Sequence, residues 1–265
     1  MEPVDISRGD APLILAVPHA GLFVPDRIAA QLNETGCQLG DADWYVDRLY
    51  DGLVDNVTTV RANFHRYVID ANRDPSGASL YPGQNTTGLC PLTDFHGEDI
   101  YKNGCAPAAS EIKARRLAFH APYHEALTAE IERIRAKHSA AIVYDCHSIR
   151  SEIPYLFDGA LPDFNIGTFN GQSCDRRIED AVAEICAGAD NYSSVVNGRF
   201  KGGWTTRHYG KPIDGVHAIQ MELAQKTYLR ECTEPDWDEA KAKALRSVLK
   251  EILTALVELA PDMKA

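Results

Sequence analysis

The sequence predicts a mixed α/β fold, in which helices flank a sheet, and three observations predict it. Short apolar runs rich in β-branched residues recur along the chain, as expected of buried strands. Segments with the periodicity of amphipathic helices lie between these runs, which favours helical crossovers between parallel strands. No linker, repeat or low-complexity tract divides the 265 residues, so residues 1–265 are expected to form a single domain.

The elements expected before the middle of the chain are short. Val24–Asn33 is predicted to be a short helix or turn, and Asp43–Asn56 has the period of an amphipathic helix. Val57–Ala62 and Arg66–Ile69 have the composition of a pair of short strands. Ser76–Gly104 is rich in Gly, Pro, Thr and Asn. Long irregular segments of this kind are usually functional, and its aromatic and charged residues favour an ordered loop that lines a site.

The second half contains longer elements. Pro107–His138 is predicted to be a long helical region, interrupted near Pro122, that crosses over to a parallel strand at Ala140–Tyr144. The remaining elements are expected in this order: a strand at Phe164–Phe169, a helix at Ser173–Ala187, a strand at Ser193–Asn197, a flexible cationic loop at 197–208, a strand at Val216–Met221 and a helix at Trp237–Leu259.

Three of the predicted strands lead into residues that can do chemistry. These strands are Pro12–Val17, Ala140–Tyr144 and Val216–Met221, and the residues that follow them are His19, His147 and Glu222. In open α/β sheets, ligands bind at the carboxyl ends of the strands. We therefore expect these three side chains to face one site.

Composition excludes several classes of partner. The net charge of −11 argues against nucleic-acid binding, which requires a clustered basic surface. The apolar runs are shorter than the 18–20 residues or so of a membrane span, and the N-terminus lacks the pattern of a signal peptide. The 7 cysteines form no CxxC pair, which favours reduced thiols and a cytoplasmic location. The oligomeric state stays open, and a homo-oligomer is compatible with the sequence.

The two histidines and a carboxylate predict a metal site. Two imidazoles and one carboxylate are common ligands of a catalytic zinc, with water at the fourth position. Asp43, Asp47 and Asp51 recur at every fourth residue of the predicted helix, and apolar residues flank Asp47 at its centre. Asp47 is therefore the preferred third ligand beside His19 and His147. Nitrogen and oxygen ligands do not discriminate strongly between Zn²⁺ and other divalent metals such as Co²⁺.

Glu222 is a candidate general base that would take a proton from water activated by the metal. His120 and His124 are spaced as a helical pair, but Pro122 lies between them and no carboxylate completes a site, so packing or substrate contact is favoured. A thiol nucleophile at Cys146 is disfavoured, because adjacent strand residues face opposite sides of a sheet. Ser148 lies in no GxSxG motif, which disfavours serine catalysis.

Cationic side chains gather in the loops expected around the metal. They are Arg73, Arg150, Lys201 and Arg207. Guanidinium groups bind carboxylates through two hydrogen bonds. Several cations around one site would therefore select a small dicarboxylate substrate. The alternative is that these are solvated loop charges, but their concentration in an otherwise acidic chain favours a function.

Several motifs are similar to those of a known family. They are VPHAG at 17–21, DADWYVDRLYD at 41–51, RYVIDANRDP at 66–75, LYPGQNTTGLCPLTDFHGEDIY at 80–101, YDCHSIRS at 144–151, LPDFNIGT at 161–168, NGRFKGGWTTRHYGKP at 197–212 and QMELAQKTYL at 220–229. In these stretches the chain resembles the N-formylglutamate amidohydrolase (N-formylglutamate deformylase) family of bacterial histidine utilisation. The resemblance implies hydrolysis of N-formyl-L-glutamate to formate and L-glutamate. It also implies a fold related to the zinc carboxypeptidase and aspartoacylase type.

Site residues follow from the resemblance position by position. His19 and His147 look like the two histidine ligands, Glu222 like the base, and Asn72 with Arg73 like a carboxylate clamp. The related carboxypeptidases use His-x-x-Glu, whereas Leu22 stands three residues after His19. The carboxylate ligand must therefore come from elsewhere, with Asp47 as the first choice and Asp43 as the reserve.

The implied reaction assigns the remaining residues. Arg150, together with the metal, is expected to stabilise the oxyanion that forms when water attacks the formyl carbon. The further substrate contacts expected are Arg207, Lys201 and, in the long loop, Gln84. Two alternatives stay open: a metallohydrolase of another N-acyl amino acid or small peptide, and a non-catalytic metal- or amino-acid-binding protein.

Overall fold

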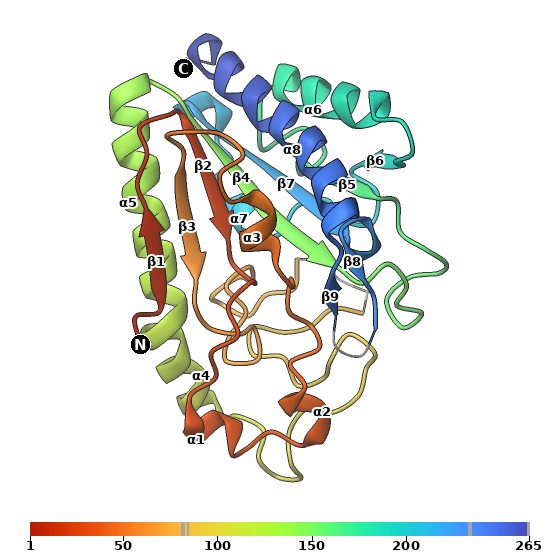
Figure 1. Cartoon of the computed structure of the whole chain (residues 1–265). Coiled ribbons are helices and arrows are strands. Elements are labelled where there is room, and N and C mark those ends of the chain that lie inside the picture. Colours follow the sequence, from red (N-terminus) through yellow and green to blue (C-terminus); the bar gives the residue numbers. More distant parts are fainter. Residues whose placement is uncertain (81–82, 84, 233–234, 264–265) are drawn as a thin grey trace.

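A mixed sheet forms the centre of the molecule (Figure 1). Figure 1 presents a computed structural model, which describes residues 1–80, 83, 85–232 and 235–263. Among these residues, seven strands pair in the order β1-β3-β2-β4-β7-β5-β6. Their bounds are β1 Val4–Ser7, β2 Leu13–Val17, β3 Thr58–Ala62, β4 Ala141–Ile149, β5 Phe164–Gly167, β6 Ser194–Val196 and β7 Val216–Ala224. A separate small ribbon pairs β8 (Leu229–Arg230) with β9 (Asp236–Trp237).

The four inner strands β3, β2, β4 and β7 are parallel to one another. β1 and β5 are antiparallel to their inner neighbours β3 and β7, and β6 is parallel to β5. In the pairing of β4 with β7, His147 lies opposite Glu222. Because neighbouring residues of a parallel pair face the same side of the sheet, the register already brings these two side chains together.

Helices cover both faces of the sheet (Figure 1). On one face α5 (Ala121–His138) packs apolar residues such as Leu127 and Ile131 against the sheet. On the other face lie α3 (Val46–Tyr50), α6 (Arg176–Gly188) and α8 (Glu239–Leu259). The other helices are α1 Asp26–Ala29, α2 Glu34–Cys37, α4 Ala109–Arg115, α7 Trp204–Tyr209, the π-helical turn Arg116–His120 and the 3₁₀ turns Pro212–Asp214, Gln225–Thr227 and Ala260–Asp262.

Side chains alternate along the strands, and this alternation explains why the sheet has an apolar core on each face. In β2, Leu13, Leu15 and Val17 belong to the core shared with α8. The residues between them, Ile14 and Ala16, belong to the core shared with α5. Every residue of β2, β4 and β7 is buried, which is why these strands have the nearly continuous apolar composition of inner parallel strands.

The predicted fold class is therefore confirmed, and most of the predicted strands and long helices are found. Two strands run further than predicted, because β4 continues to Ile149 and β7 to Ala224. Their polar ends, which include His147 and Glu222, are paired strand residues rather than loop residues. The interruption expected near Pro122 is the π-helical turn between α4 and α5.

Other local predictions were wrong. The edge strand β1 was missed, because its mostly exposed side chains leave no apolar pattern. Arg66–Ile69 is not a strand, although it is fully buried. The helix predicted over Asp43–Asn56 is reduced to α3, and the loop predicted at 197–208 contains most of α7. In the part of the chain described, every helix is too short or too polar to cross a membrane.

Candidate active site

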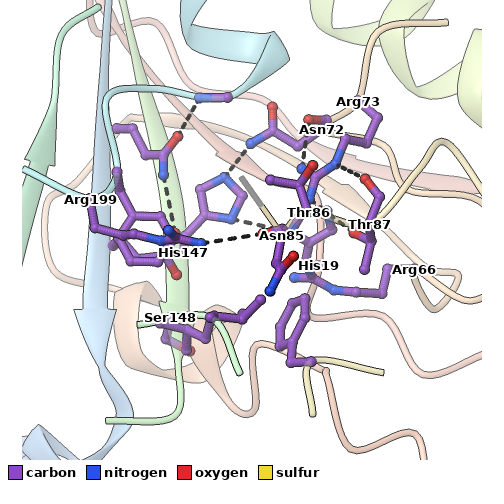
Figure 2. A pocket seen from close by; sticks show the side chains of 17 residues that line it. His19, Arg66, Asn72, Arg73, Asn85, Thr86, Thr87, His147, Ser148 and Arg199 are labelled. Carbon is purple, nitrogen blue, oxygen red and sulfur yellow. Dashed lines mark hydrogen bonds between the residues drawn. The ribbon is translucent and has the colours of Figure 1, made fainter. Parts of the chain in front are cut away.

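A cavity opens where the parallel strands end, and Figure 2 shows the side chains that line it. Its polar residues come from several elements of the fold: His19 follows β2, His147 lies on β4, and Glu222 lies on β7. Asn72 and Arg73 come from the irregular segment after β3. The predicted convergence of strand ends on one site is thus found.

His19 and His147 of the cavity lining form, together with the buried Asp43, a cluster that could hold a metal ion. His19 Nδ1 lies 3.2 Å from His147 Nδ1, and Asp43 Oδ2 lies 3.1 Å from the same His147 atom. Asp43 Oδ2 is also 3.8 Å from His19 Nδ1. All three residues are buried, and their ligand atoms lie within 4.8 Å of one another. Two imidazole nitrogens and one carboxylate oxygen match the ligand set of a catalytic zinc site.

The Nε2 atom of each imidazole, on the side away from the cluster, lies close to a second buried carboxylate. His19 Nε2 lies 2.7 Å from Asp70 Oδ1, and His147 Nε2 lies 3.1 Å from Asp145 Oδ1. Histidine ligands of metals commonly make such contacts, which orient the ring and increase its basicity. In both rings Nδ1 is therefore the nitrogen that points toward the cluster, and the donor set fits a divalent metal.

The two imidazoles of the cluster differ in their electrostatic surroundings. Burial would lower the pKa of His147, but Asp145, Asp43 and Glu222 raise it well above its ordinary value, so these carboxylates stabilise a positive charge there. Burial, together with the charge of Arg66, lowers the pKa of His19. Burial also raises the pKa of Glu222 to about 8, and the neighbouring charge of Asp43 adds to the effect.

The identity of the clustered aspartate differs from the sequence prediction, which preferred Asp47. Asp43 lies before α3, and its backbone N–H donates to the His19 carbonyl at 3.1 Å. Arg66 Nη2 donates to Asp43 Oδ1 at 2.6 Å, which leaves Oδ2 for the cluster. Asp47 lies within α3, where its carboxylate accepts a hydrogen bond from Arg61 at 2.6 Å and its side chain is 34% exposed. The structure thus brings Asp43, the reserve choice, to the two histidines and not Asp47. Because the helix begins only at Val46, Asp43 and Asp47 share no helical face.

Arginines border the cavity, but they are not all the predicted ones. Arg73 lines it and donates to the carbonyl and hydroxyl of Thr87 at 3.0 Å. The other arginines in its lining are Arg66 and Arg199, and in Figure 2 Arg199 lies on the opposite side of His147 from Arg66 and Arg73. Both were missed as candidates for the site, although the motif RYVIDANRDP begins with Arg66.

Three of the predicted substrate or catalytic cations lie elsewhere. Arg150, Lys201 and Arg207 are absent from the cavity lining among the described residues. Arg207 instead donates to the carbonyls of Gly202 and Leu80 and lies over the Phe169 ring. Gln84, the remaining predicted contact, lies outside the described residues. The positions of charged residues in the loops did not predict which of them line the cavity. The orientation of such a side chain depends on the carbonyl groups that folding brings beside it.

Asn72 connects the cluster to α7. Its Nδ2 lies 2.8 Å from His147 Nε2 and donates to Asp145 Oδ2 at 3.3 Å. Its Oδ1 accepts the backbone N–H of Thr205 at 2.8 Å. A Cβ at Gly203 would lie 2.4 Å from Asn72 Nδ2, so only glycine allows the start of α7 to approach this closely. The Asn72 amide is therefore held in one orientation.

The remaining sequence expectations concern residues near the cluster. Cys146 packs in the core on the face of the sheet that α8 covers, as predicted from strand alternation. Asp70 and Asp145 were missed as site residues, although Asp145 stands two residues before His147 and so shares its face of the strand. His120 and His124 contact backbone carbonyls rather than the cluster.

Comparisons with known proteins point to one family. The family model described as N-formylglutamate amidohydrolase matches residues 11–229. An N-formylglutamate deformylase of Pseudomonas putida is 47% identical over 252 residues, which cover 94% of both chains. One from Pseudomonas aeruginosa is 42% identical over 257 residues, covering 97% of this chain and 96% of the relative. The crystal structure of an N-formylglutamate amidohydrolase from Ralstonia eutropha JMP134 shares the fold, with a TM-score of 0.81, 23% identity and 98% coverage of both chains.

Proposed function

The chain belongs to the N-formylglutamate amidohydrolase family, and from this we propose that it hydrolyses N-formyl-L-glutamate to L-glutamate and formate. One observation carries the proposal: a buried His-Asp-His cluster lies beside a carboxyl group of raised pKa, in a cavity bordered by arginines. The names of the relatives support the choice of substrate. In this proposal residues 1–265 act as one catalytic domain.

The cluster is proposed to hold a zinc ion, or another divalent transition metal such as Co²⁺, through His19, Asp43 and His147. When bound, such a metal lowers the pKa of water and polarises a carbonyl group. Asp70 contacts Nε2 of His19, and Asp145 and Asn72 lie beside Nε2 of His147, so that Nδ1 of each ring faces the metal position. Arg66 holds the other oxygen of Asp43, which fixes the direction of its ligand atom.

Glu222 is the proposed general base. It takes a proton from the attacking water and delivers it to the amine that leaves as glutamate. Burial raises the pKa of Glu222 to about 8, so its deprotonated form is a stronger base than an ordinary carboxylate. Gln220 Nε2 donates to Glu222 Oε2 at 3.1 Å, which orients the carboxylate toward the cavity. Arg66 replaces Arg150 as the proposed oxyanion partner, since Arg66 lines the cavity and contacts Asp43.

Recognition of the substrate is proposed to depend on its two carboxylates, because the formyl group offers little surface for binding. Arg73 and Arg199 approach the cavity from different loops and can each pair with one carboxylate. Phe95, Leu156 and Phe200 line the cavity between polar groups and can pack on the methylene carbons of glutamate.

We predict that Arg73→Ala and Arg199→Ala each raise the KM for N-formyl-L-glutamate by about 10- to 100-fold, with bound metal unchanged, because each removes a charge-assisted hydrogen bond. Steady-state kinetics and metal analysis measure both quantities. Arg207→Ala is the matched control, since its guanidinium is directed at loop carbonyls. Equal KM values for wild type and the Arg73 and Arg199 variants would remove both residues from the clamp.

The function itself is tested by formate release from N-formyl-L-glutamate. The protein is assayed as purified, after chelation, and after Zn²⁺ or Co²⁺ is restored. We expect activity that is lost on chelation and recovered with metal. N-acetyl-L-glutamate and N-formyl-L-alanine are the comparison substrates and should react poorly. Faster release from either of these would replace the proposed substrate with another N-acyl amino acid.

A further inference from the structure

The segment Arg66–Arg73 supplies Arg66, Asp70, Asn72 and Arg73 to the site, yet it has no regular secondary structure of its own. All of it is buried except Arg73, which is partly exposed. Buried carbonyl groups outside a helix or sheet must find other hydrogen-bond donors, since an unpaired one is costly. The partners of these carbonyls therefore determine how rigidly the four site residues are held.

Three basic side chains from one helical region contact four of these carbonyls. The buried Arg115, at the end of α4, donates to the carbonyls of Tyr67 at 3.3 Å and Val68 at 3.1 Å. His124 Nε2 lies 2.8 Å from the Ala71 carbonyl, and His120 Nε2 lies 3.0 Å from the Arg73 carbonyl. The two imidazoles thus hold the backbone immediately before and after Asn72.

The helical region has an irregularity at this place. The π-helical turn Arg116–His120 separates Arg115 from α5, and His120 is its last residue. An extra residue per turn changes the direction of every side chain that follows it, and π turns are frequently found at functional sites. His124 is fixed further by Tyr209 of α7, whose hydroxyl lies 2.9 Å from its Nδ1. The helix therefore presents both imidazoles to one short segment.

We propose that His120 and His124 are positioning residues, which hold Asn72 and Arg73 in the geometry that binds the substrate carboxylate. The proposal rests on the proposed function for the identity of the substrate. It assigns a role to a histidine pair that touches neither the substrate cavity nor the metal cluster. Loss of either hydrogen bond loosens the backbone at Ala71 or Arg73. The three metal ligands lie on other segments, and Arg115 still holds the carbonyls of Tyr67 and Val68, next to Arg66.

The test compares leucine and glutamine at each position. Leucine retains apolar bulk but donates no hydrogen bond, whereas the amide of glutamine can replace the imidazole N–H. We expect His120→Leu and His124→Leu each to raise KM by about tenfold, the effect of one lost hydrogen bond, with kcat changed less and bound metal unchanged. The glutamine variants should stay close to wild type. If a leucine variant does not fold, asparagine, whose shorter amide reaches the carbonyl less well, takes its place.

His138 provides a matched control, since it is the last residue of the same helix and its Nε2 contacts the Asp10 carbonyl at 2.6 Å instead of the segment Arg66–Arg73. His138→Leu should leave KM unchanged. In an Arg73→Ala background, His120→Leu should add little, because the group that it positions is gone. A KM unaffected by leucine, an equal effect of His138→Leu, or failure of glutamine to restore KM would overturn the positioning role.

Hydrogen exchange separates this inference from the proposed function. The leucine variants should exchange the backbone amides of residues 66–73 faster than wild type, and the glutamine variants should not. This readout requires no turnover. If wild type releases no formate from N-formyl-L-glutamate, the proposed function fails, and the exchange result still decides whether the two histidines hold the segment. Unchanged exchange in the leucine variants would overturn the inference alone.

Discussion

Glu222→Gln is expected to lower kcat for formate release by about 10²- to 10⁴-fold, the range attributed to general acid–base catalysis. Glutamine has nearly the shape of glutamate, so the cavity should keep its form, but it cannot accept the proton of the attacking water. The neighbouring His147 lies opposite Glu222 in the sheet and stays available to the metal. Bound metal should therefore remain at the wild-type level, and KM should change much less than kcat.

Glu130→Gln is the matched control for this experiment. Glu130 is also a buried glutamate, but it pairs with Arg8 and Arg133 away from the cavity. Its substitution should change the stability of the protein and leave kcat intact. Full activity of Glu222→Gln with metal bound would exclude Glu222 as the base. Such a result would also reopen the alternative that the chain binds a metal or an amino acid without catalysis.

The second large effect distinguishes Asp43 from Asp47. Asp43→Asn is expected to weaken metal binding by more than about 100-fold and to remove activity at ordinary metal concentrations. Even residues that only orient a metal ligand contribute ~10- to 100-fold to metal affinity, and a direct ligand should contribute more. Asp47→Asn removes a partly exposed ion pair with Arg61, and such pairs contribute ~1 kcal/mol or less to stability. Metal content after dialysis, together with calorimetric titration of the metal-free proteins, measures the difference.

The two variants control for each other, because each replaces one aspartate that pairs with an arginine by the same amide. Loss of metal in Asp47→Asn with normal binding in Asp43→Asn would restore the choice made from helical periodicity. Loss of metal in neither variant would mean that the ion is held by other groups. Restoration of Asp43→Asn activity at high Zn²⁺ concentration would show that the aspartate contributes affinity rather than chemistry.

Much of the fold followed from local patterns. β2, β4 and β7 are buried on both faces, so their apolar runs were visible in the sequence, and so were the amphipathic α5, α6 and α8. Elements whose stability comes from neighbours were not visible. β1 pairs at the sheet edge with mostly exposed side chains, and Arg66–Arg73 is held by hydrogen bonds from a distant helix.

By itself, the sequence determined the inner strands and the family, and it placed His19, His147 and Glu222 near the ends of three strands, because apolar strand runs and family motifs are local properties of the chain. Only the tertiary structure decided which aspartate and which arginines join them. Asp43 reaches the histidines through the loop that precedes α3, and Arg66 and Arg199 come from separate segments. The direction of a loop side chain is decided by the carbonyls and charges that folding brings near it. Those partners are distant in the sequence, so a local sequence pattern does not predict them.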